Sequence, residues 1–174
     1  MISSHYKTRS QRVWSVRSSP SLRQAEIERV KRKRPDSLDA YDLVLRATPL
    51  ALAAMPENAL QALPLLERAL ALEPDYALAH GYVAWCHEIL FQRAGSGEEN
   101  RRAAISHAHA AIIHGRDDAM ALTLGGFNIG LVEHDRAAAR EAFEAAVALS
   151  PSSALTYSMG SHCSRLGGRG RACG

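Results

Sequence analysis

Large aromatic side chains, β-branched runs and cysteines are all scarce in this chain of 174 residues. Phe, Trp and Tyr make up only 6% of the residues. Runs of β-branched residues are almost absent, which makes an extended sheet an unlikely core. The three cysteines are odd in number and have no regular spacing. A disulfide framework is therefore not expected, and a reducing compartment fits best.

The chain also lacks a long apolar segment. No apolar run reaches the roughly 18–20 residues of a membrane span. Residues 1–19 are polar and basic, so they lack the apolar core of a signal peptide. These absences exclude a membrane-spanning protein and predict a cytoplasmic one.

Alanine and leucine dominate the 47% of residues that are hydrophobic. Both residue types lose little entropy in a helix, so the composition predicts an all-α protein. The charges are divided sharply along the chain. Residues 1–35 contain ten Lys/Arg and two Asp/Glu, whereas residues 36–160 contain eight Lys/Arg and sixteen Asp/Glu. The expected folded part is therefore acidic, and the basic charge belongs to the segment before it.

Four regions follow from these patterns. Residues 1–19 are dominated by Ser and Arg, and residues 161–174 are rich in Gly, Arg, Ser and Cys. Neither end shows periodicity, and both are expected to be disordered. Residues 20–35 predict a weakly amphipathic, basic linker helix that ends before a proline. Residues 36–160 predict helices over 38–52, 59–72, 77–92, 99–114, 119–132, 136–149 and 154–159. In the first of these, Leu38, Tyr41, Leu45 and Leu52 lie at helical spacing.

An internal repeat organises residues 36–160. Three helix junctions align, with the sequences ALEPDYALAHG at 71–81, IHGRDDAMALT at 113–123 and ALSPSSALTYS at 148–158. Anchored on Pro74, Arg116 and Pro151, the periods are 42 and 35 residues. Before each junction, three residues recur at fixed spacing, and the middle one is larger in the first and third units: Ala62, Leu66 and Ala69; Ala104, Ala108 and Ala111; Ala139, Phe143 and Ala146. Small residues allow two helices to approach closely, and the larger one fills the space between them.

This pattern resembles the tetratricopeptide repeat, whose period is about 34 residues. The resemblance implies about three helical hairpins stacked into a superhelix. The repeats are degenerate: His80 and Leu122 replace the expected Trp, His87 and Ile129 replace the expected Tyr, and Arg116 replaces the junction proline.

A narrower resemblance covers residues 20–160. The stretch RKRPDSLDAYDL, followed by LLERALALEPDYALAHGYVAWCHE, is similar to the C-terminal repeat region of bacterial adenylate/guanylate cyclase-like regulators. The resemblance implies a signalling context without cyclase activity, because the catalytic domain of such regulators lies upstream of this region. We expect the chain to be a fragment of a longer regulator.

Candidate catalytic and metal sites are weak. The eight histidines include no i, i+4 pair in the helices that contain His80, His87, His107, His109 and His114, so a metal site is disfavoured. Cys86 and His87 are adjacent and point about 100° apart on a helix, which disfavours a Cys–His nucleophile. The loop at 95–97 lacks the Lys-Ser/Thr of a phosphate loop. No catalytic residue, cofactor or metal is therefore predicted.

The resemblance implies a concave groove that binds an extended or helical peptide. The residues expected to face it are Leu78, Gly81, Trp85, Glu88, Thr123 and Phe127, with Trp85 and Phe127 as anchors. The predicted function is thus a protein–protein interaction module.

Two alternatives remain open. The chain could be the regulatory region of a cyclase-like protein, or residues 31–34, KRKR, could contact nucleic acid, although no interleaved aromatics favour this. The last hairpin is expected to stop at Met159 and leave an apolar face uncovered, which predicts self-association or marginal stability.

Overall fold

The computed structural model describes residues 38–95 and 97–168, with side chains as far as Cys163. Within this part the chain is entirely helical, as the composition predicts, and no strand occurs. The elements in order are α2 (Leu38–Leu52), α3 (Pro56–Leu72), α4 (Ala77–Arg93), α5 (Gly97–His114), α6 (Ala119–Asn128), the π-helical turn η1 (Ile129–Glu133), α7 (Arg136–Leu149) and α8 (Ala154–Gly168).

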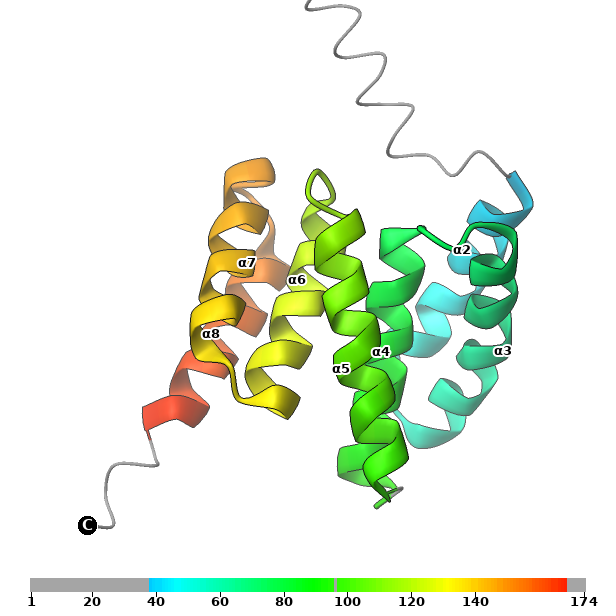
Figure 1. The fold of residues 1–174 in the computed structure, drawn as a ribbon, viewed down its shortest axis with the longest axis horizontal. Coiled ribbons are helices and arrows are strands. Elements are labelled where there is room, and N and C mark those ends of the chain that lie inside the picture. Colours follow the sequence, from blue (N-terminus) through cyan, green and yellow to red (C-terminus); the bar gives the residue numbers. More distant parts are fainter. Residues whose placement is uncertain (1–37, 96, 169–174) are drawn as a thin grey trace, which may run out of the picture.

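The helices form a row in which each one packs on its neighbours in sequence (Figure 1). The connections are two to four residues long, so consecutive helices run antiparallel. Alternate helices also touch: α2 packs on α4, α4 on α6, and α6 on α8. As a result, α2 and α3 lie at one end of the row, and α7 and α8 lie at the other.

Small residues set the closest helix contacts, as the repeat pattern predicts. Ala84 of α4 and Ala108 of α5 are fully buried in one cluster. A Cβ added to Gly126 of α6 would lie 2.9 Å from the Cβ of Ala142 in α7. A side chain at Gly126 would therefore force α6 and α7 apart.

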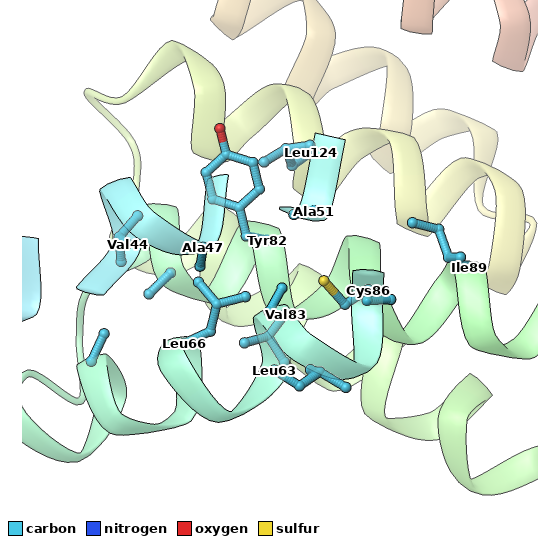
Figure 2. Packing of buried hydrophobic residues seen from close by; sticks show 14 of the residues in the cluster. Val44, Ala47, Ala51, Leu63, Leu66, Tyr82, Val83, Cys86, Ile89 and Leu124 are labelled. Carbon is cyan, nitrogen blue, oxygen red and sulfur yellow. The ribbon is translucent and has the colours of Figure 1, made fainter. Parts of the chain in front are cut away.

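The larger core residues lie where α2, α3, α4 and α6 meet (Figure 2). Leu66, Val83, Cys86 and Ile89 are almost completely buried there. Leu66 is the larger residue of its repeat triplet, so it fills the space that the flanking alanines leave.

The leucine stripe of α2 does not face this core. The buried residues of α2 are Ala40, Leu43, Val44, Ala47 and Ala51. Leu38, Tyr41, Leu45 and Leu52 are 81%, 42%, 51% and 47% exposed. The helix therefore has two apolar faces, and the face of smaller residues is the buried one because α3 and α4 approach closely there.

The C-terminal boundary also differs from expectation. Helix α8 does not stop at Met159 but continues to Gly168, so residues 161–168 are helical rather than a disordered tail. Tertiary contacts explain the extension. The Cys163 thiol donates a hydrogen bond to the Phe127 carbonyl oxygen at 3.8 Å, and the His162 ring lies 5.9 Å from that of Phe127. The predicted tail 1–19, the linker helix 20–35 and residues 169–174 lie outside the described residues.

Candidate functional site

The predicted groove residues lie mostly inside the protein. Only Leu78 and Trp85 are half-buried; the other four are buried, namely Gly81, Glu88, Thr123 and Phe127. The structure brings these residues together along α4 and α6, but their surface is covered by neighbouring helices. These six positions therefore offer little exposed surface to a partner.

Trp85 and Phe127, the predicted anchors, contact each other. Their ring centroids are 5.3 Å apart with the planes tilted by 55°, a favourable arrangement for two aromatic rings. The indole Nε1 of Trp85 donates a hydrogen bond to the Ala51 carbonyl oxygen at 2.8 Å. This bond ties α4 to the end of α2, so Trp85 has a structural role.

Thr123 and Gly81 sit at close helix contacts. The Thr123 hydroxyl donates to the Ala119 carbonyl oxygen at 2.6 Å and lies 2.8 Å from the Thr156 hydroxyl, which links α6 to α8. A Cβ at Gly81 would lie 3.2 Å from the Cβ of Leu124. Both positions serve packing between alternate helices of the row.

Glu88 is a buried acid in the middle of α4, and only 7% of it is exposed. Burial raises the pKa of its carboxyl group to about 7, and the nearby Arg93 opposes this rise. The carboxyl group is therefore partly protonated at neutral pH, which reduces the free-energy cost of burying it.

A large cavity lies elsewhere, between α7 and α8, and the sequence patterns did not predict it as a site. It has a volume of about 780 Å³. Phe143 and Val147 of α7 and Gly160 of α8 contribute its apolar lining, and Arg140 and Glu144 lie at its rim. Arg140 and Glu144 form an exposed ion pair with an N–O distance of 3.3 Å. A large apolar cavity with a charged rim is typical of a binding site.

The repeat explains why this cavity, which we call the α7–α8 groove, stays open. At the 35-residue period, Leu122 and Gly126 of α6 correspond to Tyr157 and Ser161 of α8. Leu122 is 3% exposed and Gly126 is buried against α7, whereas Tyr157 is 52% exposed and Ser161 is exposed. The surface that α7 covers on α6 is therefore uncovered on α8. The groove could have been located from the sequence by shifting the buried positions of α6 by one 35-residue period onto α8.

A histidine pair joins α4 to α5. The Nδ1 atoms of His80 and His107 are 2.8 Å apart, and Nε2 of His80 lies 2.8 Å from the Pro74 carbonyl oxygen. A carbonyl oxygen only accepts, so His80 must donate from Nε2. Its Nδ1 then accepts from the Nδ1–H of His107, which requires the His80 ring to be neutral.

Further titratable groups surround this pair. The His87 and His114 rings lie 6.3 and 6.0 Å from those of His107 and His80 respectively, and His114 lies 3.7 Å from Asp75. Burial lowers the pKa of His107 to about 4, with further lowering from His80 and His87. Burial also lowers the pKa of His80, partly offset by its hydrogen bond to Pro74.

The thiols and the acidic clusters suggest no chemistry of their own. Burial raises the pKa of the Cys86 thiol to about 12 and that of Cys163 to about 11, so both stay protonated at neutral pH. In the part of the chain that the structure describes, no group of three His, Cys, Asp or Glu side chains is placed to hold a metal ion. Asp118 accepts hydrogen bonds from the Met120 and Ala121 amides and so caps α6.

Within residues 38–95 and 97–168, no helix is both long and apolar enough to cross a membrane. Comparison with known proteins adds no relative: no family model, curated protein or solved structure matches the chain.

Proposed function

We propose that this chain is a protein–protein interaction module of the tetratricopeptide type, which binds a helical segment of a partner protein in the α7–α8 groove. The arrangement of the helices supports this proposal. Antiparallel neighbours pack in sequence, and α2, α4, α6 and α8 pack on one another in turn. Stacked helical hairpins, in which each unit buries the apolar face of the one before it, would make the same set of contacts.

The groove itself carries the proposal. It is apolar, has a volume of about 780 Å³, and occupies the place where a further helix would continue the row. Inside the row, the equivalent surface of α6 is covered by α7 through Ala139, Ala142 and Ala146, which are all buried. An amphipathic helix that presents small residues at spacings of three and four would fit the α7–α8 groove in the same way.

The signalling context rests on the resemblance of residues 20–160 to cyclase-like regulators. In such a protein, the helical row would recruit a partner and would take no part in catalysis itself.

A capture experiment with the full chain as bait tests this function. Tyr157→Asp places a charge in the uncovered face of α8, and Val147→Asp places one in the lining of the groove. Leu60→Asp is the matched control, because Leu60 of α3 is 60% exposed and lies at the other end of the row. Captured proteins are identified by mass spectrometry from bacterial extract.

The expected result is a protein retained by the wild type and by Leu60→Asp, and reduced at least tenfold by both groove variants. Circular dichroism must show unchanged helix content in every variant. Equal capture by all four chains would exclude the groove as the binding surface.

A further inference from the structure

The exposed apolar stripe of α2, formed by Leu38, Tyr41, Leu45 and Leu52, needs an explanation of its own. Leu38, Leu45 and Leu52 are seven residues apart, so they lie on one line about 21 Å long along the helix. Each of these leucines is at least 47% exposed. A continuous apolar line of this length on a helix is typical of a surface that another helix covers.

We propose that residues 21–34 of this same chain form a helix that packs antiparallel on this stripe and closes this end of the row. Three residues, 35–37, separate that segment from the start of α2. The other connections in the row are two to four residues long, and each joins two antiparallel helices in contact. A connector of the same length places residues 21–34 directly beside α2.

The apolar residues of the two segments meet in this register. Counted outward from Asp36, Ile27 and Leu45 are each nine residues away, so they face each other in an antiparallel pair. By the same count, Val30 lies opposite Asp42, next to Tyr41, and Leu22 lies opposite Leu50 in the last turn of α2, which also holds Leu52. Leu22, Ile27 and Val30 of the short amphipathic segment therefore each lie within two residues of the register position of a stripe residue.

The charges of the two surfaces are complementary. Residues 20–35 contain six Lys/Arg and two Asp/Glu. The basic run at residues 31–34 lies next to the start of α2, where Asp39 and Asp42 are exposed. Basic side chains at the C-terminal end of the segment are also favoured by its own helix dipole. Packing and electrostatics thus both favour an antiparallel arrangement of residues 21–34 on α2.

A disulfide trap in the full chain tests the register. Ile27→Cys and Leu45→Cys are combined in a background of Cys163→Ser and Cys173→Ser, and the protein is exposed to mild oxidant. The expected product is a disulfide within one chain, formed at least tenfold faster than in the control that pairs Ile27→Cys with Leu60→Cys. Leu60 is 60% exposed on α3, so its accessibility matches that of Leu45.

Hydrogen exchange gives an independent measurement on the chain without added cysteines. Amides of residues 21–34 should exchange at least tenfold more slowly in the wild type and in Leu60→Asp than in Leu45→Asp. A disulfide between two copies through Leu45→Cys would identify a second chain as the occupant and overturn the proposal. Equal trapping by both cysteine pairs, no trapping, or unprotected amides in the wild type would overturn it as well.

Discussion

The hydrogen bond between His80 and His107 exists only while His80 is neutral, since a proton on its Nδ1 would place two donors 2.8 Å apart. The lowered pKa of each ring has the same origin, because burial between α4 and α5 disfavours the charged form. The unfolded chain, with histidine pKa values near 6.5, binds more protons than the folded one below that pH.

We therefore expect acid to weaken the fold through this pair. The contribution of His107 is complete above about pH 6.5 and is lost as the pH falls toward 4. We expect a loss of about 1–2 kcal/mol, less than the full shift implies, because the partly exposed ring is screened by solvent. Urea unfolding at pH 7.5, 6 and 5 measures this. In His107→Gln, whose amide can still donate to His80, the pH dependence should be smaller; an unchanged slope would contradict the role of the pair.

Glu88 should have the opposite effect on stability. Its pKa rises from 4.5 in the unfolded chain to about 7 in the fold, so the folded state binds more protons. The free energy of unfolding therefore decreases as the pH rises through this range. Glu88→Gln should raise the free energy of unfolding at pH 8 by about 1–2 kcal/mol, because the amide carries no charge to bury. Chemical denaturation at pH 8 and pH 5 tests this, and a less stable variant at pH 8 would show that the ionised carboxylate stabilises the fold.

The contact between α6 and α7 depends on the absence of a side chain at Gly126. An added methyl group would lie 2.9 Å from Ala142 Cβ and 3.2 Å from the Ala139 carbonyl oxygen. We expect Gly126→Ala to destabilise the protein by about 1–3 kcal/mol. Gly160→Ala is the control, because the nearest atoms to its added methyl group are those of the Phe143 ring at 3.6 Å, an ordinary contact. Thermal melts should show a lower Tm for Gly126→Ala only; equal melting temperatures would contradict the close contact.

Helix packing also decided which face of α2 is buried. Its periodicity is equally consistent with a core built on Leu45 and Leu52 or on Ala47 and Ala51. Because α3 and α4 approach α2 closely, the alanine face is buried and the leucines are left outside. Sequence spacing identifies an apolar stripe, but it does not identify the neighbour that the stripe meets.

The row of helices as a whole should open from its ends. Helix α4 packs on α2, α3, α5 and α6, whereas α8 packs mainly on α6 and α7. In a one-dimensional row, local opening is easiest where the fewest neighbours must be released. We expect amides of α8 to exchange with solvent at least tenfold faster than those in the middle of α4. Native-state hydrogen exchange read by NMR measures both, and equal protection of the two helices would indicate a single cooperative unit.

The sequence alone determined the helical class, the junctions near Pro74, Arg116 and Pro151, and the small residues at which helices approach. These are local properties, since propensity and spacing act within a few turns of one helix. Only the tertiary structure decided that Glu88, Thr123 and Phe127 are buried, that α8 continues beyond Met159, and that the open apolar surfaces lie at the two ends of the row. Burial depends on which neighbouring helix covers a face. The spacing of apolar residues along one helix does not specify how closely another helix approaches it.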